Sequence, residues 1–350
     1  MSQPTIFDLE HYPLPPARPR RRPGRIIAIV VVLALLGGAG LWAVSNRQYL
    51  ADQLVVWNYT ASDDIEGYIT RSTMTDKGAF LFTASAPAIV AGEEFNEVCG
   101  SGEAGTGILG CYLPRTKTIS LYDVTDERLD GIEDVVASHE MLHAAWDRMS
   151  AEEQAAVVPL LEAEATALAG DAEFVARMDL YDRTEPGERD NELHSIIGTE
   201  FAELSPELEK YYSRYFSDRS VVVGFHAAYV KVFSDLETQA LDLSSQILAL
   251  ADEIDADTNA YNSDQTQLNA DIDAFIARNQ AYGYSNDPAA FDRDKAALIA
   301  RDAELGTRLT AINDKKTRLG DLQKQLRDLD ADAEALNRSI DSTIVPGEGI

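Results

Sequence analysis

Apolar residues recur every seven positions in two long series near the C-terminus of this 350-residue chain. The first series comprises Ile247, Ile254, Tyr261, Leu268 and Phe275, and the second comprises Leu298, Leu305, Ile312, Leu319 and Leu326, interleaved with Leu322, Leu329 and Leu336. A turn-forming segment, Gly283 to Pro288, separates them. Heptads of this length predict a coiled coil, and one turn between two series favours an antiparallel helical hairpin over residues 233–342. The alternative is a compact helical bundle. Asp257 and Asp264 interrupt the first seam, so we expect looser pairing there.

An uncharged apolar run covers residues 26–44, which is long enough to span a bilayer as a helix. Five arginines lie just before it, between Arg18 and Arg25, and positive charge stays on the cytoplasmic side. We therefore expect a cell-membrane signal anchor at 26–44, with the N-terminus cytoplasmic and the rest extracytoplasmic. A cleaved signal peptide is the alternative. Residues 1–25 are predicted to be a disordered cytoplasmic tail, 45–60 a stalk and 343–350 a flexible C-terminal tail.

The two cysteines, Cys99 and Cys111, both fall in the part expected to be exported. Outside the cytoplasm, a disulfide between them is the expected pairing, and no CxxC spacing supports zinc ligation by thiolates instead. The formal net charge of −29 repels nucleic acid, so we expect no nucleic-acid partner.

The segment from His139 to His143 reads HEMLH, the HExxH pattern of zinc proteases. On a helix, residues four apart share a face, so both histidines can bind one metal ion. Glu140 then sits beside them, within reach of a water at that ion. Apolar residues at helical spacing predict a helix over roughly 128–148, capped by Thr125 or Asp126. The motif predicts one Zn²⁺ per chain, with Glu140 as the catalytic base.

A third protein ligand is needed for a catalytic zinc. The HExxHxxGxxH pattern fails, because Trp146 and Met149 occupy its glycine and histidine positions. A glutamate on a later helix, predicted over 191–204, is therefore expected. Glu200 is favoured because it lies on the same stripe as the apolar residues Leu193, Ile197 and Leu204. The alternatives are Glu192, on a face expected to be solvated, and Glu162 or Glu164, about 20 residues after His143.

His194 is a candidate catalytic residue, because a histidine near the site can support a ligand or donate to a substrate oxyanion. A structural histidine is the competing interpretation. The same ambiguity applies to His226 and to Tyr211, Tyr212 and Tyr215, since aromatic residues at helical spacing are typical of packing.

Residues 61–232 are predicted to form an α+β domain that is mainly helical, with a small antiparallel sheet. A short helix is expected from Ser62 to Thr73, strands within 78–92 and 112–124, and a loop at 182–188. Ser150 and Glu153 form a capping-box pattern that opens a helix running to about Leu168.

The segments HEMLHAAW and NELHSIIGTEF, behind one membrane anchor, resemble gluzincin-type zinc metallopeptidases. More narrowly, they resemble uncharacterised membrane-anchored metallopeptidase-like proteins of actinobacterial type, over roughly residues 60–230. The resemblance implies a zincin-like domain, with His139, His143 and a downstream glutamate as ligands and Glu140 as base.

These features favour a membrane-anchored extracytoplasmic zinc endopeptidase that acts on a protein or peptide substrate, with a possible protein partner on the coiled-coil arm. The alternative is a non-enzymatic envelope protein whose metal site is structural or vestigial. A hydrolase of a non-peptide amide in the cell wall is a third, weaker hypothesis. Glu140 favours an enzyme, because a purely structural metal site needs no base.

Overall fold

The computed structural model describes residues 16, 23–90, 92–100, 108–184 and 186–340, which divide into two compact units, Met1–Trp57 and Asn58–Ile350. The first unit contains α1 (Pro23–Ser45) and most of α2 (Arg47–Asn58). The stalk expected over 45–60 is therefore largely helical. Apart from residues 16 and 23–25, the two predicted tails, 1–25 and 343–350, lie outside the described residues, as do residues 341 and 342 of the predicted hairpin.

The apolar run lies within α1. In the described part of the chain, no single helix is long and apolar enough to cross a membrane. The helices Val30–Ser45 and Arg47–Asn58 meet that requirement together, with a bend of 76° between them.

The second unit opens with two short capped helices, α3 (Asp63–Arg71) and α4 (Asp76–Thr83). Ser62 accepts a hydrogen bond from the amide of Ile65, which confirms the helix start expected at Ser62. The segment 80–82, expected as a strand, lies instead in α4. A short apolar run fits a buried helix as well as a strand, and the Thr75 side chain, which accepts from the amide of Gly78, caps this one as a helix.

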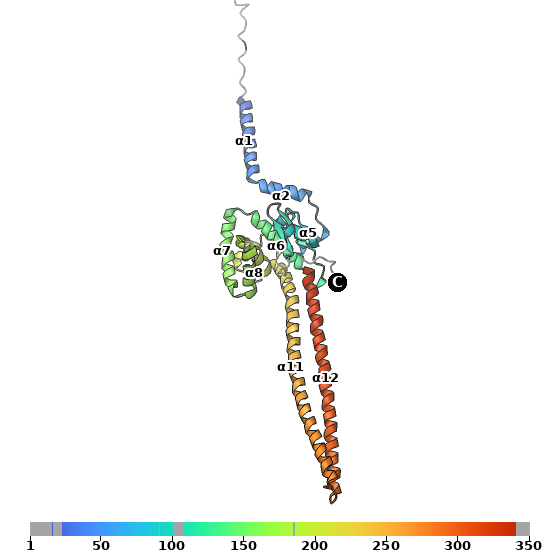
Figure 1. Cartoon of the computed structure of the whole chain (residues 1–350). Helices are drawn as coiled ribbons and strands as arrows, with labels where there is room; N and C mark the ends of the chain where they lie inside the picture. The colour runs from blue at the N-terminus through green and yellow to red at the C-terminus, as the bar shows by residue number, and fades with distance from the viewer. Residues whose placement is uncertain (1–15, 17–22, 91, 101–107, 185, 341–350) are drawn as a thin grey trace, which may run out of the picture. The chain divides into compact units, whose positions relative to one another are not determined.

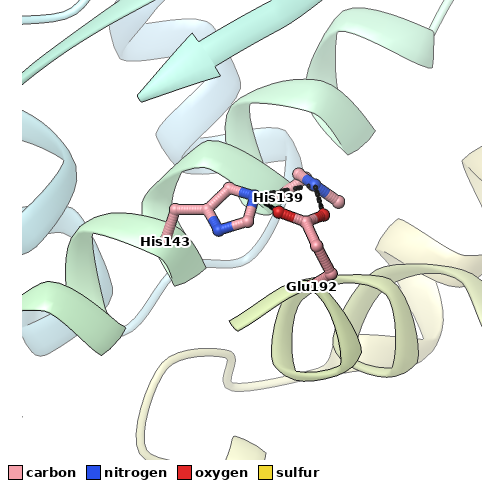
Figure 2. A group of neighbouring side chains, drawn as sticks. All are labelled: His139, His143 and Glu192. Carbon is pink, nitrogen blue, oxygen red and sulfur yellow. Dashed lines mark hydrogen bonds and ion pairs between the residues drawn. The ribbon is translucent and has the colours of Figure 1, made fainter. Parts of the chain in front are cut away.

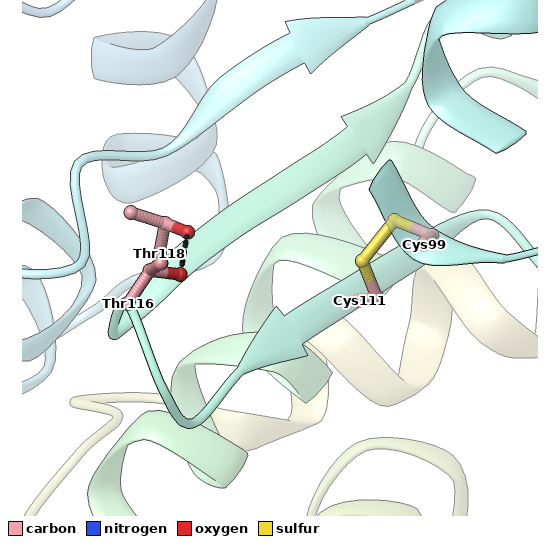
Figure 3. The surroundings of a disulfide bond; sticks show 4 residues. All are labelled: Cys99, Cys111, Thr116 and Thr118. Atoms are coloured by element: carbon pink, nitrogen blue, oxygen red, sulfur yellow. Dashed lines mark hydrogen bonds between the residues drawn. A yellow bond between two sulfur atoms is a disulfide. The ribbon is translucent and has the colours of Figure 1, made fainter. Parts of the chain in front are cut away.

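Within the described residues the sheet has three strands, β1 (Ala88–Val90), β2 (Gly110–Leu113) and β3 (Thr118–Tyr122), in the order β1-β3-β2. β2 runs antiparallel to β3, with Cys111 opposite Ser120, but β1 runs parallel to β3. The predicted antiparallel sheet is therefore a mixed one. The helix α5 (Gly92–Cys99) follows β1, and the expected disulfide joins its last residue, Cys99, to Cys111 on β2 (Figure 3).

The part of the second unit outside the helical hairpin is called the head below. Its remaining elements are the helices α6 (Ile132–Asp147), α7 (Ala151–Ala167), α8 (Ala172–Thr184), α9 (Arg189–Glu200) and α10 (Pro206–Tyr212), with short 3-10 turns at Glu127–Leu129 and Leu168–Gly170. Asp126 caps the first 3-10 turn rather than α6. The predicted capping box at Ser150 and Glu153 is present in full. Residues 182–184, expected in a loop, complete α8. The main hydrophobic core surrounds α6 and α9, so these two helices are held rigidly against each other.

Two long helices, α11 (Arg219–Gln280) and α12 (Pro288–Ile340), form the hairpin and lie side by side (Figure 1). The turn falls where the sequence predicted it. The boundary expected between residues 232 and 233 lies inside α11, which continues unbroken into the head. Leu336 near the end of α12 belongs to the main core, and Asp332 pairs with Arg128 at 2.7 Å. The hairpin is thus attached to the head through both helices.

Ion pairs join the two arms at intervals of seven residues. They are Arg278–Asp294 at 3.2 Å, Asp271–Arg301 at 2.6 Å, Asp264–Arg308 at 2.6 Å and Asp257–Lys315 at 2.9 Å. From one pair to the next, the residue number falls by seven on α11 and rises by seven on α12. The two arms therefore run antiparallel. The aspartates that interrupt the predicted seam are therefore partnered across the hairpin. Leu250, Ile254 and Leu322 form a separate buried cluster, while coiled-coil packing over the whole length stays a prediction.

Candidate metal centre

The helix α6 carries His139, Glu140 and His143 through the middle of the head. Its start is fixed by Gly131, whose φ of +94° is left-handed and whose missing side chain leaves room for the ring of Phe225 on α11. In the first turn, Asp134 is almost fully buried and accepts hydrogen bonds from Arg71 at 3.0 to 3.2 Å. Burial raises the pKa of Asp134, against the opposing effect of Arg71. These contacts hold the histidine-bearing helix firmly in place.

Glu192 on α9 faces the two histidines of α6 (Figure 2). The Nε2 atoms of His139 and His143 are 3.0 Å apart. Glu192 Oε1 lies 3.6 Å from His143 Nε2, and its Oε2 lies 4.0 Å from His139 Nε2. Zinc bonds of 2.0–2.1 Å in tetrahedral geometry separate ligand atoms by about 3.3 Å. The three side chains therefore match the spacing of a small metal site, and together they can hold a metal ion.

The residue before Glu192 orients one of the histidines. Asn191 Oδ1 lies 2.9 Å from His143 Nδ1, and because an amide oxygen only accepts, Nδ1 carries the proton. The Nε2 atom of His143 then presents its lone pair to the cluster, which is the tautomer a metal ligand needs. Asn191 is thus a positioning residue supplied by the same helix as Glu192.

The imidazole of His139 is held neutral. Burial lowers its pKa well below the ordinary value, and the nearby ring of His143 and the positive charge of Arg177 act in the same direction. A neutral imidazole is the form that binds a metal. The environment of His139 therefore favours ligation over protonation.

The side chain of Glu140 extends from α6 toward the strand β2. Its side chain is 5% exposed, and it packs beside the backbone of Gly110. A Cβ atom at position 110 would lie 2.4 Å from Val136 Cγ1 and 3.0 Å from Glu140 Oε1. Both distances are shorter than ordinary van der Waals contact. Only glycine at the start of β2 leaves this carboxylate its present position.

Glu200, the predicted third ligand, is not part of the cluster. It ends α9, two turns beyond Glu192, where it forms an ion pair with Arg177 and lies 3.6 Å from His226 Nε2. The choice of Glu200 over Glu192 assumed that the face of α9 that carries Glu192 is exposed to solvent. Residues 192–199 are all buried, because α6, α7, α8 and α11 surround the helix, so the face of Glu192 looks onto α6 rather than onto water. Glu192 takes the place assigned to Glu200.

The remaining candidate glutamates also lie elsewhere. Glu162 pairs with Arg189 at 3.1 Å, and Glu164 accepts a hydrogen bond from the backbone amide of Ser205 at 3.3 Å. Both are engaged in contacts between α7 and the segments that flank α9. Neither belongs to the group around the histidines.

His194, predicted as a catalytic residue, lies in an aromatic cluster of the core. Its ring stacks on Tyr212 and contacts Trp146, and its Nε2 lies 2.8 Å from the hydroxyl of Tyr211. Its side chain is fully buried, and burial, with the nearby ring of His143, lowers its pKa to about 3. These contacts are typical of a packing residue, and a catalytic role for His194 stays a prediction. Tyr215 belongs to the same aromatic cluster.

Sequence reasoning missed two groups near the site. Asn191 directly precedes Glu192, and this adjacency is the signal that would have found it. Tyr181 on α8 gave no signal. Burial, reinforced by the carboxylates of Glu192, Glu200 and Glu140, raises its pKa, so the hydroxyl stays protonated and can donate a hydrogen bond.

Comparison of the chain with protein-family models, with curated proteins and with solved structures finds no match. The resemblance to gluzincins therefore stays a prediction.

Proposed function

We propose that this protein is a membrane-anchored, extracytoplasmic, zinc-dependent endopeptidase. The observation that carries the proposal is the convergence of His139, His143 and Glu192 on one point, with Glu140 on the same helix as both histidines. Three ligands of this type, contributed by two helices that pack together, are the usual protein share of a catalytic zinc site, which leaves a position for water or substrate.

A bound zinc ion would supply Lewis acidity toward the attacking water and the scissile carbonyl. Within that arrangement, Glu140 takes the proton from the water and passes it to the leaving amine. Asn191 keeps the His143 ring oriented through its Nδ1–H. Since Gly110 is the residue packed beside the Glu140 carboxylate, it keeps the base in place.

The proposed location outside the cytoplasm is supported by the Cys99–Cys111 disulfide, because such bonds persist mainly in oxidising compartments. The apolar segment 26–44 and the arginines before it support a membrane anchor with a cytoplasmic N-terminus.

A non-enzymatic binding protein is the second candidate, favoured by the long hairpin with its ordered cross-arm ion pairs. In that case the metal site would stabilise the head, and Glu140 would be dispensable. The two candidates predict different behaviour of one substitution, Glu140→Gln.

The test uses the full chain purified in detergent. Elemental analysis is expected to find one zinc per chain, lost in His143→Ala. Glu140→Gln is expected to keep the zinc and to lose hydrolysis of an unfolded protein such as casein. If Glu140→Gln cleaves as fast as the unchanged chain, or if no zinc binds, the endopeptidase proposal is rejected.

A further inference from the structure

A cavity of about 350 Å³ opens between α8, α9 and the base of α11. Its apolar wall comes from all three helices, through Phe174, Ile196, Phe201 and Val230. Phe174 and Phe201 meet edge to face with ring centres 5.5 Å apart. The volume lies within the range of small-ligand sites, about 300–1,000 Å³.

The cavity begins one helical turn from the candidate metal centre. Glu192, Ile196 and Glu200 follow one another along α9 at intervals of four residues, and each interval advances about 6 Å along the helix and turns about 40° around it. Ile196 and Glu200 line the cavity, whereas Glu192 faces the histidines. A chain bound across the metal centre would therefore reach the cavity with a neighbouring side chain.

Each charged group that lines the cavity has a partner, and the Asp171 carboxylate accepts a hydrogen bond from the backbone amide of Phe174 at 3.0 Å. Arg177 pairs with Glu200, and Lys231 pairs with Asp235 at 2.7 Å. His226 contacts Glu200, and burial lowers the pKa of His226 to about 4, so its ring is neutral at pH 7. An apolar wall whose charged neighbours are already engaged suits an uncharged apolar group rather than an ion.

We propose that this cavity receives a bulky apolar side chain of a peptide substrate, next to the bond that is cleaved. The inference rests on the proposed function and adds the substrate class. It also makes α11 part of the specificity site, since Val230 and Ala227 on that helix form one wall. The hairpin would then contribute directly to substrate selection at its base.

The test compares two substitutions at neighbouring alanines of α11. Ala227 lines the cavity and Ala228 does not, although both are exposed. Ala227→Trp places a large ring at the cavity, and Ala228→Trp adds the same ring outside it. Equal zinc content and equal melting temperature verify that both variants are folded.

The probes are peptides of one sequence that differ only beside the cleaved bond, where they carry glycine, alanine, leucine or phenylalanine. The full chain is expected to prefer phenylalanine and leucine over glycine by roughly 10- to 100-fold in kcat/KM, as burial of such a side chain implies. Ala227→Trp is expected to reduce this preference below about threefold, and Ala228→Trp to keep it. A preference that survives in Ala227→Trp, or an unchanged chain without preference, overturns the proposal.

Binding of the same peptides to the zinc-loaded chain, measured by calorimetry, separates the two hypotheses. If the chain cleaves no peptide, the endopeptidase proposal fails. The cavity is still supported if phenylalanine peptides bind more tightly than glycine peptides and Ala227→Trp removes the difference. Equal binding of all four peptides rejects it.

Discussion

Two glutamates on α9 provide a matched test of the metal centre. Glu192→Gln and Glu200→Gln are isosteric, remove the same charge and lie eight residues apart on one helix, about 12 Å along its axis. Glu192 Oε1 is 3.6 Å from His143 Nε2, whereas Glu200 pairs with Arg177 and His226. Only the first substitution alters the group that can hold a metal.

The expected magnitudes differ accordingly. Removing a residue that merely supports a metal ligand weakens binding by about 10- to 100-fold. Loss of a ligand itself should therefore exceed about 100-fold, or about 2.7 kcal/mol at 1.36 kcal/mol per factor of ten. Glu200→Gln should leave zinc affinity within about threefold and instead lower the free energy of unfolding by about 1–3 kcal/mol, because Arg177 loses a partly buried ion-pair partner.

Competition with a chromophoric chelator measures the zinc dissociation constant of each variant, and thermal unfolding of the metal-free protein measures stability. Equal losses of affinity in the two variants, or a Glu192→Gln protein that binds zinc within tenfold of the unchanged chain, would refute the assignment of Glu192.

Three further predictions concern the base, the partly buried His226 and the hairpin. Gly110→Ala should displace the Glu140 carboxylate and reduce kcat by about 100-fold, while zinc content stays at one per chain. Steady-state kinetics measures the first effect and elemental analysis the second. Full activity in this variant would contradict the role given to Gly110. His226 has a folded pKa of about 4, below its usual 6.5, so the unfolded state binds more protons. The contribution of neutral His226 to the free energy of unfolding, about 3 kcal/mol, should be present above pH 6.5 and lost as pH falls toward 4. In denaturant titrations, His226→Asn should reduce the dependence of the free energy of unfolding on pH in this range. Asp264→Arg opposite Arg308 should speed hydrogen exchange in the middle of the arms and cost no more than about 1 kcal/mol, because the pair is exposed; unchanged exchange would argue against a paired hairpin.

Features that depend on local chemistry were predictable from the sequence. The HExxH helix, the capping box at Ser150 and the hairpin turn before Pro288 all depend on residues a few positions apart. The helical hairpin followed from its heptads, since a pattern sustained over many turns leaves little ambiguity. Cys99 and Cys111 formed the expected pair because they were the sole cysteines.

Features that depend on packing from several sides were not predictable. The third member of the metal cluster required knowing that α6 covers the face of α9 on which Glu192 lies. Likewise, the full burial of His194 depends on tyrosines 17 or more residues away. The segment 80–82 became helical rather than extended because of its cap at Thr75. The parallel pairing of β1 with β3 depends on a long-range connection through α5 and β2, which no local pattern specifies.

The order of charges on the hairpin specifies how its helices align. In three of the four ion pairs described above, an aspartate of α11 faces a basic residue of α12. In the pair nearest the turn the charges are reversed, with Arg278 of α11 facing Asp294 of α12. A slip of seven residues would preserve the apolar pattern. In one direction it would set Asp271 against Asp294, and in the other Arg278 against Arg301. One inverted pair therefore penalises both misalignments that the heptads alone would tolerate, and the arm keeps a defined length.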